Sequence, residues 1–112
     1  MKTQNKVEDK TYNGWTNYET WNVKLWIDND QGSQEYWNDR ASNWLSIAIE
    51  EKPFTKEERA TLDLMDELKE YFEEQNPLAS TATCYTDLLN AALSEVNWYE
   101  IAKTIIEDNL AQ

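Results

Sequence analysis

Apolar residues along most of this chain recur every three or four positions, which is the spacing of one face of an α-helix. The pattern predicts helices over residues 34–51 and 56–75, a shorter helix after residue 83, and a last helix beginning near residue 97. The residues expected to face inward are Trp37, Ala41, Trp44, Leu45 and Ala48 in the first; Leu62, Met65, Leu68 and Phe72 in the second; Tyr85, Leu88, Leu89, Ala92 and Leu93 in the third; and Trp98, Ile101, Ala102, Ile105 and Ile106 in the last. Because only two glycines and two prolines interrupt the chain, we expect an all-α fold, a single compact domain of about five helices.

The sequence of the aromatic segment Asn13–Trp26 is compatible with two predictions, a helix or a strand. Thr16-x-x-Glu19 fits a capping box, in which each side chain accepts from the other residue's amide, and this predicts a helix over residues 17–28 with Tyr18, Trp21 and Leu25 facing inward. A strand is the alternative, since apolar and polar residues also alternate from Trp21 to Asp28. The preceding Asn13-Gly14 predicts a turn.

Other helix ends carry recognisable signals. Thr55-x-x-Glu58 is a second capping box, and Ser33 and Asn97 are residue types that cap helix N-termini. Asn76-Pro77 is expected to end the helix that starts near residue 56, because proline cannot continue the hydrogen-bond ladder. We expect residues 1–11 to be a loose lead-in and residues 12–112 to form one helical domain.

The composition favours a reducing, aqueous compartment. The single cysteine, Cys84, allows no internal disulfide. The polar N-terminus does not resemble a secretion signal, and no apolar run approaches the ~20 residues that span a bilayer. We therefore expect a cytoplasmic protein with no membrane contact.

The chain lacks the usual catalytic and metal-binding patterns. It has no histidine, and therefore neither the commonest general base nor a Cys–His pair to activate Cys84. An EF-hand loop beginning at Asp28 would need Gly and Glu where Ser33 and Asp39 stand. We predict no catalytic residue, metal site or cofactor; carboxylate pairs holding Mg²⁺ and a glycosidase site are the enzyme alternatives.

Acidic residues concentrate in the second half of the chain. Residues 61–112 hold eleven acidic and two basic residues, a net charge of −9 out of −12 for the whole chain. Six carboxylates recur every three or four residues on the helix over 56–75 and so share one face: Asp63, Asp66, Glu67, Glu70, Glu73 and Glu74. Such an array resembles the phosphates of a nucleic-acid strand, and proteins that imitate DNA use it to occupy basic grooves. An ordinary solvated helix face is the alternative reading.

The tryptophans divide into two groups. Four lie in apolar stripes and are expected in the core: Trp21, Trp37, Trp44 and Trp98. Trp15 and Trp26 are candidates for anchoring a partner, because aromatic residues are prominent among binding hot spots. We expect the Trp15–Trp26 segment and the Trp98–Ile106 helix to meet at the centre of the core.

Two segments resemble a known group of proteins. Tyr12-Asn13-Gly14-Trp15-Thr16-Asn17-Tyr18-Glu19-Thr20-Trp21-Asn22-Val23 resembles a family of small proteins encoded by bacteriophages, plasmids and bacterial genomes. Val96-Asn97-Trp98-Tyr99-Glu100-Ile101-Ala102 is similar to the start of that family's C-terminal helix. The resemblance implies a mobile-element setting in a bacterial cell, where small acidic proteins often inhibit defence nucleases.

Together these features predict a non-enzymatic, acidic binding protein. We expect it to inhibit a host defence complex of the anti-CRISPR or anti-restriction type by occupying a basic, nucleic-acid-binding surface, without binding nucleic acid itself. The alternative is a structural or regulatory interaction module that uses the aromatic N-terminal segment.

Overall fold

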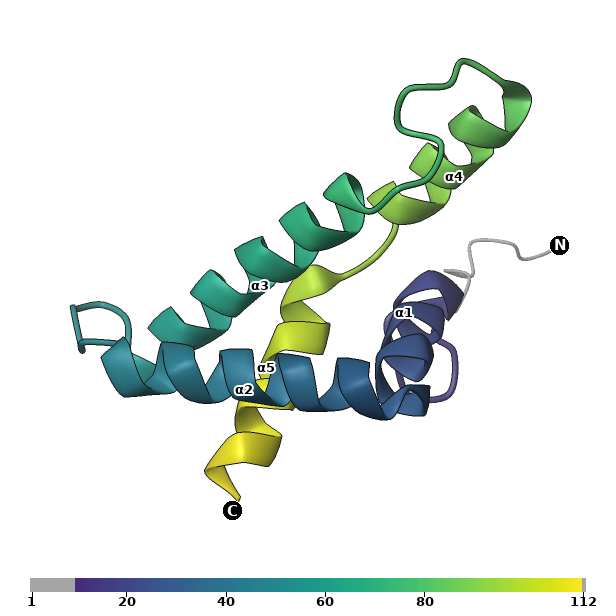
Figure 1. The fold of residues 1–112 in the computed structure, drawn as a ribbon. Coiled ribbons are helices and arrows are strands. Elements are labelled where there is room, and N and C mark those ends of the chain that lie inside the picture. The colour runs from purple at the N-terminus through teal and green to yellow at the C-terminus, as the bar shows by residue number, and fades with distance from the viewer. Residues whose placement is uncertain (1–9, 112) are drawn as a thin grey trace, which may run out of the picture.

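The fold consists of five α-helices joined by short connections (Figure 1). A computed structural model describes residues 10–111. The helices are α1 (Tyr18–Asn29), α2 (Gln31–Ile47), α3 (Lys56–Glu74), α4 (Cys84–Ser94) and α5 (Trp98–Leu110). The predicted all-α single domain is confirmed, and residues 10–111 contain no strand, so the segment after Asn17 is a helix. The predicted lead-in, residues 1–11, lies outside the described residues except for its last two.

α5 is the central helix, because it packs against α1, α2 and α3. Its predicted inward face is confirmed: Trp98, Ile101, Ala102, Ile105 and Ile106 are all buried. α3 contributes the buried Ala60, Leu64 and Leu68, and α2 contributes Trp37 and Ala41. In Figure 1, α2 crosses in front of α5, α3 runs obliquely beside the first part of α5, and α1 lies to one side of this crossing. The core is therefore centred on α2, α3 and α5, and the aromatic N-terminal segment borders it rather than forming its middle.

A line of aromatic rings joins these three helices. Trp37 of α2 meets Tyr71 of α3 edge to face with ring centroids 5.3 Å apart, and Tyr71 meets Phe72 at 5.3 Å. Phe72 then meets Trp98 of α5 at 5.4 Å. The predicted meeting of Trp37, Phe72 and Trp98 is thus confirmed, whereas Trp44 is only half-buried at the edge of the core.

The predicted inward face of α1 is wrong. Its buried residues are Thr20, Val23, Lys24 and Ile27, while Tyr18 is exposed and Trp21 and Leu25 are half-buried. The helix is turned this way because buried Thr20 bonds to the start of α5. Trp21 therefore belongs to the rim rather than the core.

The buried arc of α3 is also displaced from the prediction. Thr61, Leu64 and Leu68 are buried, whereas Leu62, Met65 and Phe72 are half-buried. α3 packs against α2 and α5 together, so its most buried line lies between these two neighbours.

The turn between α1 and α2 is shorter than predicted. Asp30 ends α1 and caps α2, with its Oδ2 accepting from the Ser33 amide at 2.8 Å. α2 thus begins at Gln31 rather than Gln34, and it ends at Ile47 rather than Glu51. By contrast, the capping box at Thr55 and Glu58 is confirmed, with hydrogen bonds of 2.8 and 3.1 Å.

α4 is the least integrated helix. Figure 1 shows α4 and the loop before it projecting beyond the end of α3, away from the crossing of the other helices. Tyr85 and Leu88, predicted to face inward, are 73% and 62% exposed. None of the helices in the described part of the chain is both long and apolar enough to cross a membrane.

Candidate functional site

Six carboxylates form an acidic stripe along α3, on a face whose edge adjoins α2 at Glu67. We use this name for Asp63, Asp66, Glu67, Glu70, Glu73 and Glu74. With ~100° of rotation per residue, these positions fall within an arc of about 120°. α3 spans all six positions, and its neighbours give the members of the stripe different surroundings.

Glu67 is held by α2. Its two carboxylate oxygens accept from Nε of Arg40 at 3.0 and 2.9 Å, and Oε1 also accepts from Nε1 of Trp44 at 2.7 Å. The Arg40 guanidinium lies 5.6 Å from the centroid of the Trp44 ring. Charge-assisted bonds of this kind are stronger than neutral ones. Glu67 therefore joins α2 to α3, and it is not a free carboxylate as the sequence suggested.

Glu73 is also paired, although on the surface. Lys69 Nζ lies 2.8 Å from Glu73 Oε2, and both side chains are more than half exposed. The hydrogen bond and charge of Glu73 raise the pKa of Lys69 above its ordinary value, and the charge of Asp66 adds to this. A solvated pair of this type contributes little to stability.

The remaining carboxylates of the stripe have no ion pair within residues 10–111: Asp63, Asp66, Glu70 and Glu74. Asp63, Asp66 and Glu70 border an open depression beside Trp44, which Glu67 also lines. This part of α3 offers a run of solvated negative charge next to a half-buried indole ring. Within the described residues, no group of three His, Cys, Asp or Glu side chains could hold a metal ion.

A second surface feature is the aromatic cluster of Tyr12 and Tyr18, which are exposed, and Trp21, which is half-buried. The ring centroids of these residues lie 4.8 to 5.4 Å apart. Trp26, on a neighbouring face of α1, is 67% exposed. Trp15 is half-buried and packs against the core, so of the two predicted anchors only Trp26 is openly available.

The predicted turn before α1 is confirmed, and it ends at Trp15. Asn13 and Gly14 both have positive φ, at 48° and 86°, as the turn prediction required. The turn is closed by hydrogen bonds in both directions between Tyr12 and Trp15, at 2.9 and 2.8 Å.

The capping box predicted at Thr16 and Glu19 is replaced by a clasp between two helix starts. Asn17 caps α1, accepting from the Thr20 amide at 2.9 Å. The Thr16 amide donates instead to Oε1 of Glu100 in α5 at 3.0 Å. A local motif was the simplest reading of Thr16-x-x-Glu19, but the Thr16 amide finds its carboxylate 84 residues away.

Further bonds complete this clasp. The Asn97 amide donates to Oγ1 of buried Thr20 at 2.9 Å, and Asn97 Nδ2 donates to Oγ1 of Thr16 at 3.1 Å. Asn17 Nδ2 donates to the carbonyl of Glu95 at 2.6 Å. The two most distinctive sequence segments thus bond to each other, which gives them a structural role.

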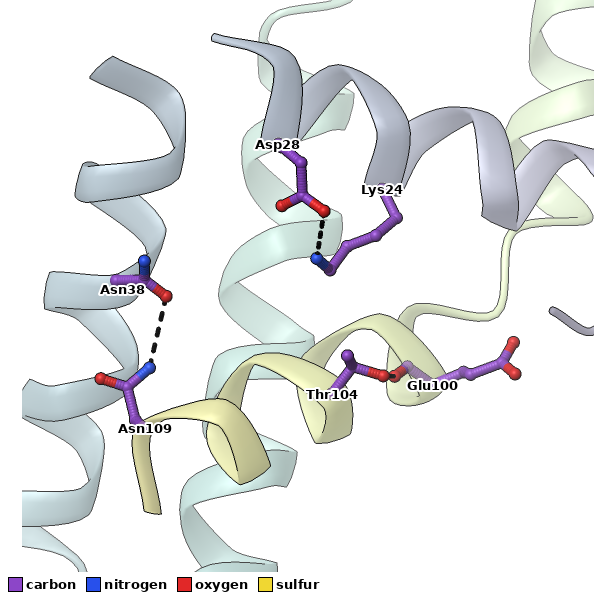
Figure 2. A network of polar contacts seen from close by, with 6 residues as sticks. All are labelled: Lys24, Asp28, Asn38, Glu100, Thr104 and Asn109. Atoms are coloured by element: carbon purple, nitrogen blue, oxygen red, sulfur yellow. Dashed lines mark hydrogen bonds and ion pairs between the residues drawn. The ribbon is translucent and has the colours of Figure 1, made fainter. Parts of the chain in front are cut away.

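Two further polar contacts lie where α1 and α2 approach α5, one within α1 and one between α2 and α5 (Figure 2). Lys24, with a side chain only 9% exposed, has its Nζ 2.6 Å from Asp28 Oδ2. Asn109 of α5 donates from Nδ2 to Oδ1 of Asn38 in α2 at 3.3 Å. A buried ammonium needs such a partner, so the Lys24–Asp28 pair is part of the packing.

The comparisons with known proteins identify a family without giving an activity. No curated protein and no solved structure matches the chain. A family model described as a family of unknown function, DUF7249, matches residues 8–112 and includes both segments of the clasp. The chain belongs to this family, DUF7249.

Proposed function

We propose that this protein is a non-enzymatic inhibitor that binds a basic, nucleic-acid-binding surface of a host protein through the acidic stripe of α3. The observation that carries the proposal is the run of unpaired carboxylates at Asp63, Asp66, Glu70 and Glu74 among the described residues. Successive members are three or four residues apart, about 4.5–6 Å along the helix axis. A basic groove that binds a phosphate backbone can accept a rigid array with this spacing.

The net charge of −12 supports the same kind of partner. It raises the rate of encounter with basic proteins and opposes binding of nucleic acid or anionic lipid. Glu67 holds α3 against α2 through Arg40 and Trp44, so the stripe is presented on a fixed element. Pre-organised charge of this kind loses little conformational entropy on binding.

The resemblance of the N-terminal segment to proteins of phages and plasmids suggests the setting. In a bacterial cytoplasm, CRISPR effectors and restriction enzymes have basic nucleic-acid-binding surfaces, and a mobile element gains protection when such a surface is blocked. Occupying that surface would exclude the DNA or RNA that the complex handles, and no bond in any substrate would need to be broken.

Capture from a host lysate tests the proposal without assuming the target. Immobilised protein should retain nucleic-acid-handling proteins at ~50 mM NaCl and release them as salt is raised, because screening shortens the reach of the charges. Mass spectrometry then identifies the target, and a nuclease assay on that target should show inhibition. Retention of no such protein at low salt would contradict the proposal.

Charge reversal on and off the stripe provides matched variants. Asp66→Lys with Glu70→Lys should weaken binding at least tenfold. The control is Asp39→Lys with Glu107→Lys, which changes the net charge equally at exposed positions on α2 and α5. If both pairs weaken binding equally, total charge rather than the stripe is responsible. Glu67 is left unchanged because it holds α2 and α3 together.

A structural or regulatory interaction module is the second candidate. The orientation of α1 favours this candidate, because it leaves Tyr18 51% exposed and Trp26 67% exposed. Under this reading, Tyr18→Ala with Trp26→Ala should abolish partner capture while reversal of Asp66 and Glu70 spares it. Binding would then depend weakly on salt, since exposed aromatic residues act through apolar contact.

A further inference from the structure

The segment that projects from the fold makes few contacts with the other helices. We define the arm as residues 76–94, which comprise the loop after α3 and the helix α4. α4 packs on the other helices far less than they pack on one another. Leu93 packs against the core cluster, whereas the contact between Asn76 Nδ2 and Asn90 Oδ1 at 3.5 Å lies within the arm itself. The side of α4 that carries Leu93 is therefore the inner side.

The outer side of α4 is apolar as well. At the helical spacing, five uncharged residues form an outer stripe: Cys84, Tyr85, Leu88 and Ala91, which are exposed, and Ala92, which is half-buried at its edge. Tyr85 is 73% exposed and Leu88 is 62% exposed. A helix that is apolar on both sides is normally buried on both sides, so the outer stripe has the character of a surface that another molecule covers.

The charge of the arm indicates what that molecule is. Of the nineteen residues 76–94, only Asp87 is charged, in a chain with 22 acidic residues and a net charge of −12. A basic protein would find its complement on α3 rather than here. A neutral, apolar surface is complementary to another neutral, apolar surface, and a second copy of this chain supplies one without bringing the two acidic stripes together.

We propose that the outer stripe of α4 is a self-association surface, through which two copies pair with their α4 helices antiparallel. A two-fold axis at Leu88 places each Leu88 against its counterpart and Tyr85 against Ala91 of the partner subunit, a large side chain against a small one. A parallel pair would instead oppose Tyr85 to Tyr85 and Asp87 to Asp87. Isologous pairing of this kind is the commonest symmetry of homodimers.

The size of the arm determines the strength of the dimer. α4 has eleven residues and is therefore about 16 Å long. An interface confined to this helix falls below the ~1,200–2,000 Å² of stable protein–protein contacts. The dimer should therefore be weak and depend on concentration, with Kd in the range of about 10–500 μM.

Salt distinguishes this surface from the acidic stripe. Two copies that each carry −12 repel one another, so screening by added salt should strengthen self-association. Binding of a basic partner to α3 should weaken under the same change. The two proposals can therefore fail independently.

Sedimentation equilibrium from ~10 μM to ~1 mM protein tests the proposal. The mass should rise from 13.2 kDa toward twice that value as concentration increases, and more steeply at 0.5 M than at 0.05 M NaCl. Leu88→Glu and Leu88→Lys should each raise Kd at least tenfold. Because the two variants change net charge in opposite directions, a shared effect assigns the loss to apolar packing at this position.

The matched control is Ile49→Glu, which adds the same charge at a residue that is 77% exposed outside the arm. It should leave Kd within threefold of the unaltered protein, and circular dichroism should show unchanged helix content in all three variants. Three results would overturn the proposal: a monomer at every concentration, equal effects of Ile49→Glu and Leu88→Glu, or dissociation by Trp26→Glu but not by Leu88→Glu.

Discussion

At the scale of single residues, Glu67 and Glu70 are neighbours on one stripe with different roles. Glu67→Gln should lower the free energy of unfolding by about 1–2 kcal/mol, because Arg40 and the Trp44 indole lose a charged acceptor that is largely shielded from solvent. Glu70→Gln is the isosteric control; it should change stability by less than about 0.5 kcal/mol or increase it slightly, since like charges lie three and four residues away. Urea denaturation measures both. Equal effects would show that Glu67 does not hold α2 to α3.

Thr20 is the buried centre of the clasp between α1 and α5. Its hydroxyl donates to Asn17 Oδ1 at 2.6 Å and accepts from the Asn97 amide at 2.9 Å, and the residue has no exposed surface. Thr20→Val keeps the shape but leaves the part-buried backbone amide of Asn97 without its acceptor, so we expect a loss of about 1–3 kcal/mol in the same denaturation assay.

Thr104→Val provides a comparison for this loss. The Thr104 hydroxyl donates only to the Glu100 carbonyl of its own helix, at 2.9 Å (Figure 2). Removing it leaves no amide without an acceptor, so this variant should cost clearly less than Thr20→Val. A larger cost for Thr104→Val would mean that the clasp does not contribute as its geometry indicates.

The residue types at the clasp were visible in the sequence, but their partners were not. Asn97 was expected to cap α5 and does so, accepting from the Glu100 amide at 3.0 Å. The side chain of Glu100 then bonds to Thr16, a contact that no local spacing encodes. Local caps follow from a few consecutive residues, whereas bonds between helices depend on how the helices pack.

At the scale of helices, the orientation of α1 gives a test with two adjacent residues. Ile27 is 3% exposed and Trp26 is 67% exposed. Ile27→Ala should therefore cost about 2–5 kcal/mol through lost burial and a cavity, whereas Trp26→Ala should cost less than about 0.5 kcal/mol. Thermal unfolding followed by circular dichroism measures the difference. A larger loss for Trp26→Ala than for Ile27→Ala would contradict this orientation of α1.

The orientation of α1 was the part of the fold that the sequence predicted least well. α5 has one apolar face, and its buried residues followed directly from the spacing. α1 carries large apolar residues on several faces, so its sequence pattern fitted more than one orientation. The face that is actually buried includes a threonine and a lysine, Thr20 and Lys24, which are residue types expected on an exposed face. Such a helix is oriented by its polar bonds to α5, and these bonds are evident only in three dimensions.

At the scale of the whole molecule, the excess of negative charge should make stability depend on salt. The described residues contain three ion pairs, while the chain has 22 acidic and 10 basic residues. Repulsion among the unpaired carboxylates therefore outweighs attraction. Its reach falls from ~30 Å at 0.01 M to ~10 Å at 0.1 M ionic strength. We expect Tm to rise by about 4 °C or more between ~10 mM and ~200 mM NaCl, measured by calorimetry.

The reversal variants show where this repulsion lies. Asp66→Lys with Glu70→Lys and Asp39→Lys with Glu107→Lys each exchange two negative charges for two positive ones, so each changes the net charge from −12 to −8. If repulsion is concentrated in the acidic stripe, the first pair should raise Tm at low salt and lose most of the salt response, while the second keeps more of it. Equal responses would mean that the charge acts as a diffuse whole. Carboxylates of the acidic stripe would then repel one another no more than carboxylates elsewhere, and a basic partner that binds the stripe would relieve no local repulsion.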